Sequence, residues 1–135
     1  MKNNVTILIV DDEEVMRGLL QKILHREGYN VVIANDGADA VDILKNQDVD
    51  IIISDIKMPN MNGFELLQHV KNNLNNISII MMTAFGDSYT VKDALLLGAD
   101  EYITKPFKSF EITLVVERAY WRLLSSRNDK KQLVK

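Results

Sequence analysis

Short runs of consecutive apolar residues alternate along this chain with stretches in which apolar residues recur every three or four positions. A short apolar run indicates a buried strand, whereas the spacing of three or four indicates one face of a helix. The predicted strands span residues 5–10, 31–34, 50–54, 77–82 and 100–103. The predicted helices span residues 14–26, 35–45, 62–71, 87–98 and 109–125.

Strict alternation of strands and helices predicts an α/β fold. Each helix then connects two parallel strands by a right-handed crossover, and helices cover both faces of one sheet. The runs 50–54 and 77–82 are apolar at nearly every position. Such runs are typical of the buried middle of a parallel sheet.

The length of 135 residues fits one domain with a normal core. We expect this domain to span residues 1–125, because residues 126–135 lose the apolar stripe and form a polar extension or the start of a linker. The absence of cysteine excludes disulfides and a thiolate zinc site. The first apolar run is neither a signal peptide nor a membrane span, so we expect a cytoplasmic protein.

The charge is unevenly distributed along the chain. Residues 118–135 carry six basic groups against one acidic group, whereas the remainder carries 10 basic against 18 acidic groups. An acidic body with a short basic tail does not match a nucleic-acid-binding domain, which needs a basic face. The basic character of the tail is explained by the favourable interaction of positive charge with a helix C-terminus.

Polar side chains follow four of the predicted strands at the point where each ends. Asp11 and Asp12 follow the first strand, Asp55 the third, Thr83 the fourth and Lys105 the fifth. Ligands of open parallel sheets bind beyond the carboxyl ends of the strands. Crowded carboxylates call for a divalent cation, a shared proton or the lysine, and oxygen ligands with room for water favour Mg²⁺. One such acid alone would be explained as a helix cap, but the set has no comparable structural purpose.

The chain resembles the receiver domain of two-component response regulators over residues 5–124. The segments that carry the resemblance are Ile9-Val10-Asp11-Asp12-Glu13, Ser54-Asp55-Ile56-Lys57-Met58-Pro59-Asn60-Met61-Asn62-Gly63, Met82-Thr83-Ala84 and Gly98-Ala99-Asp100-Glu101-Tyr102-Ile103-Thr104-Lys105-Pro106-Phe107. The resemblance implies a flavodoxin-like sheet of order 2-1-3-4-5, with two helices on one face and three on the other.

The resemblance also implies the chemistry of the site. Asp55 would be the phosphoacceptor, attacking a phosphohistidine on a histidine kinase or a histidine phosphotransfer protein. Asp12 would bind Mg²⁺ directly and Asp11 through water, with Asp55 and the Lys57 backbone carbonyl completing the protein ligands. Such a domain catalyses its own phosphorylation, but it is not an enzyme acting on an outside substrate.

Three further residues receive roles from the resemblance. Lys105 would pair with Asp55 before transfer and with the phosphoryl group afterwards, and its bond to Pro106 would be cis. Thr83 and Tyr102 would form a switch pair, in which the Thr83 hydroxyl binds the phosphoryl group and Tyr102 moves into the space that it leaves. A packed strand aromatic with a solvated hydroxyl also fits Tyr102.

The last predicted helix has apolar residues on more than one face. One stripe comprises Ile112, Val115, Val116, Ala119 and Leu123, and the others are Phe110, Leu114, Tyr120, Trp121 and Leu124. A homodimer through this region, or output contacts there, would explain the surplus. A wide inner face with one or two exposed aromatics explains it equally well.

Two other classes of protein are disfavoured by specific positions. A phosphatase with an aspartyl-phosphate intermediate would need an acid where Lys57 stands. A flavodoxin-like electron carrier would need a phosphate-binding loop where Asp11-Asp12-Glu13 follows the first strand. The sequence therefore predicts a phosphorylation-controlled switch, with no direct binding to nucleic acid or membrane. Both a stand-alone receiver and the first domain of a larger regulator fit it.

Overall fold

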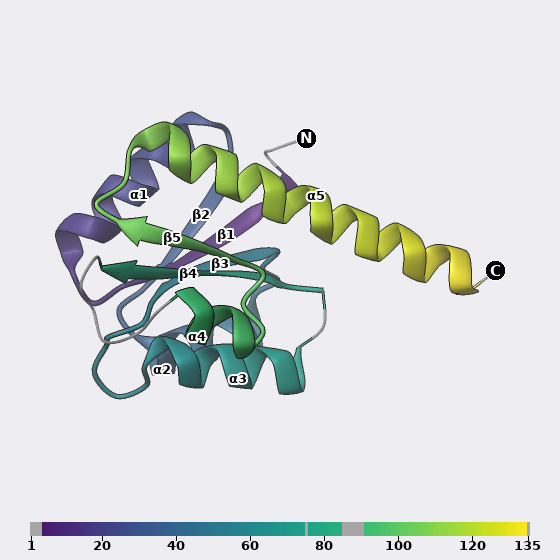
Figure 1. Ribbon diagram of the computed structural model, residues 1–135, viewed down its shortest axis with the longest axis horizontal. Helices are drawn as coiled ribbons and strands as arrows, with labels where there is room; N and C mark the ends of the chain where they lie inside the picture. The colour runs from purple at the N-terminus through teal and green to yellow at the C-terminus, as the bar shows by residue number, and fades with distance from the viewer. Residues whose placement is uncertain (1–3, 75, 85–90, 135) are drawn as a thin grey trace.

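The computed structural model describes residues 4–74, 76–84 and 91–134, with the side chains of residue 91 and residues 128–134 excepted. Within these residues the chain forms five strands and five helices in strict alternation (Figure 1). The strands are β1 Thr6–Val10, β2 Asn30–Ala34, β3 Ile51–Asp55, β4 Ser78–Ala84 and β5 Glu101–Lys105. The helices are α1 Glu14–Arg26, α2 Gly37–Asn46, α3 Gly63–Asn73, α4 Val91–Leu96 and α5 Ser109–Val134.

The sheet is parallel throughout, and its order is β2-β1-β3-β4-β5, as predicted. β3 lies at the centre, and its residues are all buried. The register sets Val10 beside Ser54 and Asp55 beside Met82. The carboxyl ends of β1, β3 and β4 therefore lie close to one another along one edge of the sheet.

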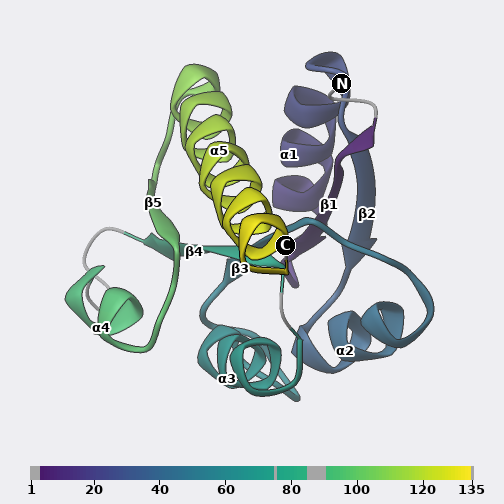
Figure 2. The same cartoon turned by 90° about the vertical axis from the view of Figure 1, so that its right-hand side faces the viewer.

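The helices cover the two faces unequally, as predicted. α1 and α5 lie on one face, and α2, α3 and α4 lie on the other (Figure 2). Successive side chains of a strand point to opposite faces. Ile7 and Ile9 of β1 accordingly pack in the cluster under α1 and α5, whereas Leu8 and Val10 pack in the cluster under α2 and α3.

Residues typical of helix ends stand at one end of each of the helices α1, α2, α3 and α4. The Asp36 side chain accepts a backbone N–H in the first turn of α2, and Asn62 forms a reciprocal capping box with Glu65 at the start of α3. Gly28 and Gly98 follow α1 and α4 with φ values of 96° and 100°, the left-handed backbone that favours glycine. The predicted start of the fourth helix, at Asp87-Ser88, lies outside the described residues.

The end predicted for the last helix, near Ser125, is wrong, since α5 continues to Val134 (Figure 1). The segment 126–134 contains neither glycine nor proline, so nothing in it breaks a helix. Arg127 also fastens the helix to the body, because its guanidinium lies 2.9 Å from the Asp50 carboxylate and 3.2 Å from the Asn76 carbonyl oxygen. The polar character of the tail therefore marks where the helix leaves the sheet, not where it ends.

Candidate functional site

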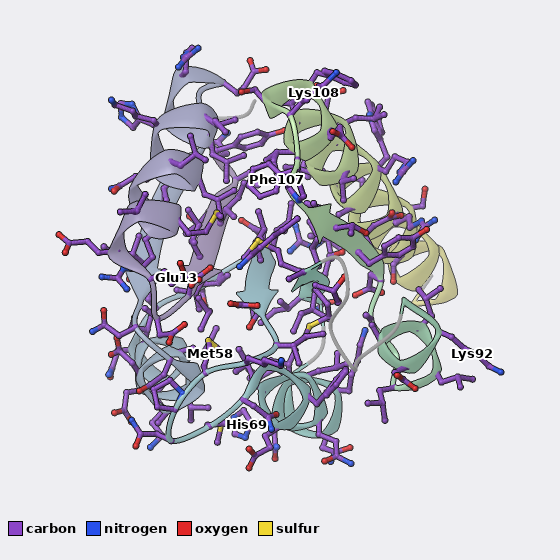
Figure 3. All side chains as sticks on the ribbon, turned by 60° about the vertical axis from the view of Figure 1, so that its left-hand side comes forward. Glu13, Met58, His69, Lys92, Phe107 and Lys108 are labelled. Atoms are coloured by element: carbon purple, nitrogen blue, oxygen red, sulfur yellow. The ribbon has the colours of Figure 1, made fainter. Side chains whose placement is uncertain are left out.

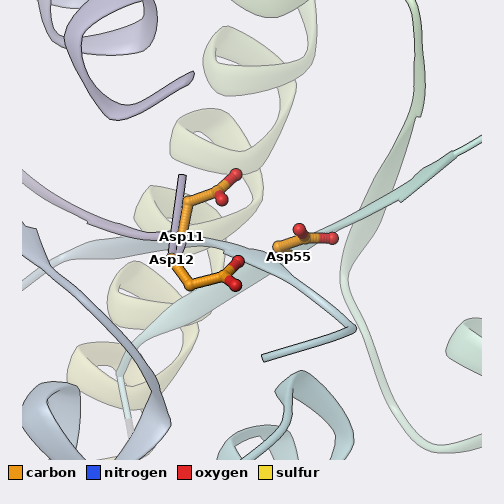
Figure 4. A group of neighbouring side chains, drawn as sticks. All are labelled: Asp11, Asp12 and Asp55. Carbon is orange, nitrogen blue, oxygen red and sulfur yellow. The ribbon is translucent and has the colours of Figure 1, made fainter. Parts of the chain in front are cut away.

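Three carboxylates meet at the carboxyl edge of the sheet. Asp11, Asp12 and Asp55 each present an oxygen within 4.8 Å of the others. Asp11 and Asp12 project toward the side on which Asp55 lies (Figure 4). Asp11 and Asp55 are buried and Asp12 is exposed. The structure thus brings together the acids that the sequence placed at the ends of two separate strands.

Lys105 faces this acidic group from the end of β5. Its Nζ donates to Asp55 Oδ2 at 3.2 Å and lies 3.5 Å from Asp11 Oδ2. The Lys105 side chain is 15% exposed, so its two ion pairs are largely shielded from water. The Lys105–Pro106 peptide bond is cis, as the resemblance implied. One ammonium group therefore stands against two buried carboxylates, with Asp12 beside them.

The electrostatic balance leaves Asp11 under-compensated. Burial raises the pKa of Asp11, and the N–H of Glu13, at 2.9 Å, and the charge of Lys105 only partly oppose this. Burial lowers the pKa of Lys105, but attraction by Asp55 and Asp11 outweighs it and the pKa is raised. Lys105 is therefore a firmly held cation, whereas the site still favours additional positive charge beside Asp11.

Thr83 and Tyr102 lie on neighbouring strands beside this group. Thr83 is 3% exposed and pairs across the sheet with Thr104, whereas Tyr102 is 39% exposed and pairs with Met81. This register makes Thr83 and Tyr102 diagonal neighbours on one face of the β4–β5 pair, a separation that an aromatic side chain can span. The geometry suits the switch expected of them.

Lys57 lies two residues after Asp55 and begins the loop that leads into α3. It lines a shallow depression with Asp12, Met58 and Asn62, beside the acidic group. The base of this loop is closed by a hydrogen bond of 2.8 Å from the Gly63 N–H to the Ile56 carbonyl oxygen. The Lys57 backbone is therefore held at the rim of the site from which it was expected to bind a metal.

Two contacts were not predicted from the sequence, one beside the site and one at the opposite end of β5 from Lys105. Asp36, at the start of α2, accepts a hydrogen bond from Asn60 in the loop after Asp55. Glu101 is buried in β5, where its carboxylate lies 2.9 Å from Arg118 and 2.7 Å from Arg122. An acid near the start of a predicted strand, together with two arginines spaced four apart on the last predicted helix, was the signal for Glu101. No comparable pattern marks the pair of Asp36 and Asn60, which are 24 residues apart.

Comparison with known proteins identifies the family. Residues 7–117 match the family model described as the response regulator receiver domain. The chain therefore belongs to the response regulator receiver family. Receiver domains are signal transducers rather than classical enzymes; they bind Mg²⁺ at an acidic pocket and interact with histidine kinases or phosphotransfer proteins.

Individual relatives agree with this family. The chain is 35% identical over 127 residues to the transcriptional regulatory protein CpxR of Escherichia coli K12, covering 91% of this chain and 54% of CpxR. It is 37% identical over 115 residues to sporulation initiation phosphotransferase F of Bacillus subtilis 168, covering 85% of this chain and 93% of that protein. The crystal structure of NtrX from Brucella abortus with ATP superposes with a TM-score of 0.89 at 30% identity, covering 96% of this chain and 29% of that one.

The chain spans about half the length of CpxR and nearly all of the sporulation phosphotransferase. Relatives of both sizes therefore contain this domain, alone or as part of a longer chain. Among the helices that the described ranges contain, none has the length and apolar character to cross a bilayer.

Proposed function

We propose that this chain is a phosphorylation-controlled switch in which Asp55 accepts a phosphoryl group from a phosphohistidine of a histidine kinase or a phosphotransfer protein. The observation that carries the proposal is the position of Asp55. Its carboxylate ends the central strand, lies within 4.8 Å of two further carboxylates and contacts Lys105 at 3.2 Å. We also place the chain in the cytoplasm, as its sequence predicts.

The transfer step is a displacement at phosphorus. A carboxylate oxygen of Asp55 forms the new P–O bond while the P–N bond to the donor histidine breaks, and the bonding electrons and a proton end on the imidazole nitrogen. The Ile56 N–H holds Asp55 Oδ1 at 2.8 Å, which orients the carboxylate. Lys105 contacts Asp55 Oδ2 before transfer and follows the negative charge onto the phosphoryl oxygens afterwards, since a lysine stem is flexible.

Four groups would hold Mg²⁺ in this site: the carboxylates of Asp11, Asp12 and Asp55 and the backbone carbonyl of Lys57. The fit is supported by the crowding of the carboxylates and by the raised pKa of the buried Asp11, because both favour an added divalent cation. When bound, Mg²⁺ neutralises the charge that accumulates on the phosphoryl oxygens during transfer.

The readout of phosphorylation is assigned to Thr83 and Tyr102. The Thr83 hydroxyl donates to the new phosphoryl group and moves toward Asp55, and the Tyr102 ring turns inward into the space. Tyr102 is exposed on the face of the β4–β5 pair where Thr83 lies, which supports this coupling. Such a change of packing, driven by a new local charge, is the general form of a phosphorylation switch.

A homodimer through the last helix region is part of the proposal. Phe110, Leu114 and Trp121 of α5 are all more than half exposed. They lie within about 40° of one another around the helix axis, opposite the residues that α5 buries against the sheet. An apolar stripe turned away from the core of its own chain favours contact with a second chain.

Acetyl phosphate tests the assignment of Asp55. The wild-type chain, incubated with acetyl phosphate and Mg²⁺, is expected to gain the mass of one phosphoryl group, and chelation of Mg²⁺ is expected to prevent the gain. Asp55→Asn should show no gain, because an amide oxygen is not a nucleophile for this reaction. Asp42→Asn, which changes an exposed acid of α2, is the matched control and should react as the wild type does. No gain in the wild type, or a gain that survives Asp55→Asn, would contradict the proposal.

Thr83→Ala separates phosphorylation from its readout. This variant is expected to gain the phosphoryl group but to remain a monomer by light scattering. The phosphorylated wild type should instead form a dimer, with twice the mass of the monomer. Thr83→Ser keeps the hydroxyl and is expected to behave as the wild type. If phosphorylated Thr83→Ala doubles in mass as well, the Thr83 hydroxyl does not couple the site to the interface. If the phosphorylated wild type stays monomeric, the homodimer is wrong.

A further inference from the structure

The loop between Asp55 and α3 contains a tight turn centred on Asn60. The Met61 N–H donates to the Pro59 carbonyl oxygen at 2.7 Å, and Asn60 has a φ of 66°. A three-residue turn with a positive central φ is uncommon and strained, and asparagine tolerates it better than most residues. Such a turn needs contacts from outside the loop to hold it in place.

The start of α2 supplies these contacts. Asn60 Nδ2 donates to Asp36 Oδ2 at 2.7 Å, and the Gly37 N–H donates to the Met61 carbonyl oxygen at 3.1 Å. A Cβ at Gly37 would lie only 2.6 Å from that oxygen, so the close approach of the two segments requires glycine. We call the two hydrogen bonds together the α2–loop clamp.

Asp36 is itself held in place on its other side. Its Oδ1 accepts the Asp39 N–H at 2.8 Å as the N-cap of α2, which leaves Oδ2 directed to Asn60. The Asp39 N–H and Asn60 both lower the pKa of Asp36, so the carboxylate is ionised at neutral pH. The hydrogen bond from Asn60 is therefore charge-assisted, which makes it stronger than a bond between neutral groups.

The clamp joins the two sides of the proposed metal site. On one side, the Asp11 N–H donates to the Ala34 carbonyl oxygen at 3.2 Å, two residues before Asp36. On the other side, Asn60 lies three residues after Lys57, whose backbone carbonyl is a proposed metal ligand. A short path of backbone and hydrogen bonds thus connects the carboxylates that end β1 with the loop that carries this carbonyl.

Apolar packing also contributes to the position of the loop. Met58 (Figure 3) and Met61 are partly buried against the cluster under α2 and α3. Methionine side chains are flexible and adapt to small shifts of the backbone, so they fix a position less sharply than directed hydrogen bonds do. The clamp therefore adds directed hydrogen bonds to the contacts that position the loop relative to Asp11 and Asp12.

We propose that Asp36 and Asn60 are positioning residues for the metal site: their hydrogen bond holds the loop so that the Lys57 carbonyl meets the cation bound by the acidic group. This inference rests on the proposed function, because it concerns the same Mg²⁺. Groups that orient metal ligands typically change metal affinity when they are removed. Neither residue contacts the phosphoryl group in this scheme, so the clamp acts on binding of the cation and on the order of the loop.

Asn60→Gly tests the clamp with little other disturbance. Glycine keeps the positive φ of the turn and removes only the side chain, without any change in net charge. We expect the dissociation constant of Mg²⁺, followed by amide chemical shifts of Asp12 and Lys57, to rise by about three- to tenfold. We also expect faster hydrogen exchange of the Met61 amide in the metal-free protein. The midpoint of urea unfolding should change little, because the site is exposed.

The exchange of the two residues supplies the rescue. In the double variant Asp36→Asn/Asn60→Asp, the amide at position 36 can still cap α2 through its oxygen and can donate its N–H to the carboxylate at position 60. The hydrogen bond and the net charge are both preserved, so the Mg²⁺ dissociation constant should return to within about twofold of the wild type. Loss of a merely helix-capping group would not be repaired by a change in the loop.

The outcomes separate this inference from the proposed function. An unchanged Mg²⁺ affinity and Met61 exchange rate in Asn60→Gly would overturn the clamp, even if Asp55 is phosphorylated normally. A double variant as weak as Asn60→Gly would also overturn it. A wild-type chain that binds Mg²⁺ at the acidic group but gains no phosphoryl group would contradict the proposed function while leaving the clamp to stand on the binding data.

Discussion

Asp11→Asn is expected to stabilise the metal-free protein and at the same time to weaken its binding of Mg²⁺. The Asp11 side chain is fully buried, and burial raises its pKa, so its charge costs free energy in the folded state. Asparagine can still accept the Glu13 N–H that Asp11 Oδ1 accepts at 2.9 Å. We expect a gain of about 0.5–2 kcal/mol in the free energy of unfolding, as is common when a functional group whose burial is only partly compensated is removed.

The same substitution removes one of the charges that attract the cation. The Mg²⁺ dissociation constant should rise at least about tenfold, as for a group that binds the metal through water. Urea unfolding with and without Mg²⁺ measures both effects in one series. Asp12→Asn is the matched control: Asp12 is exposed, so its loss should weaken Mg²⁺ binding with little gain in metal-free stability. If the metal-free Asp11→Asn variant were less stable than the metal-free wild type, the charge of Asp11 would not destabilise the folded state.

The pH dependence has a definite sign. The folded protein holds the Asp11 proton to a higher pH than the unfolded chain does, because the pKa is raised above 3.8. The stability contributed by protonated Asp11 is therefore complete below about pH 3.8 and is lost as pH rises through the folded pKa. The affinity for Mg²⁺ has the opposite pH dependence and increases as pH rises, since the cation binds the ionised carboxylate. The difference in unfolding free energy between wild type and Asp11→Asn should therefore widen as pH rises toward neutrality, and added Mg²⁺ should narrow it.

Gly63→Ala is expected to be strongly destabilising and to disturb the phosphorylation site. A Cβ at Gly63 would collide with the carbonyl oxygen of Asp55 and would lie 2.9 Å from Ile56 Cα and 2.7 Å from Met81 Cε. The methionine can move, but the two backbone atoms belong to the last residue of β3 and to the residue that follows it. We expect a loss of about 2–3 kcal/mol in the free energy of unfolding, toward the upper end for overpacking. Phosphorylation by acetyl phosphate should also slow, because Asp55 must shift with the strand.

Gly18→Ala is the matched control, with the opposite expected sign. In the described part of the structure, a Cβ at Gly18 would meet no atom within 4 Å, and Gly18 lies inside α1. Alanine there should stabilise the protein by about 0.5–1 kcal/mol, the usual gain over glycine within a helix. Equal effects of the two substitutions on urea unfolding would show that the close approach at Gly63 is not a constraint.

The order of elements and the location of the site could be predicted from local sequence, because both depend on short-range patterns. Apolar runs and helical spacing identify the strands and helices, with boundaries mostly within a few residues of the structure. Parallel strands end at one edge, so polar residues that follow them, such as Asp12 and Asp55, can be placed together before any distance is known. The role of each site residue still came from resemblance to a family.

Contacts between residues far apart in sequence could not be predicted in this way. Asp36 pairs with Asn60, and Arg127 pairs with Asp50. Both contacts follow from how whole elements pack, and no periodic pattern in the sequence predicts them. The length of α5 illustrates the difference. The loss of its apolar stripe predicted that the helix ends near Ser125, but the helix continues because the segment contains no helix breaker and Arg127 forms an ion pair with the distant Asp50.

By itself, then, the sequence determined which segments form strands and helices and which edge of the sheet carries the polar groups, because side-chain periodicity and strand direction act locally. Only the tertiary structure decided that Lys105 reaches both Asp11 and Asp55, that Asp11 is buried without full compensation, and that the start of α2 holds the loop after Asp55. The physical reason is that burial and electrostatic balance are properties of the packed assembly, to which distant residues contribute together.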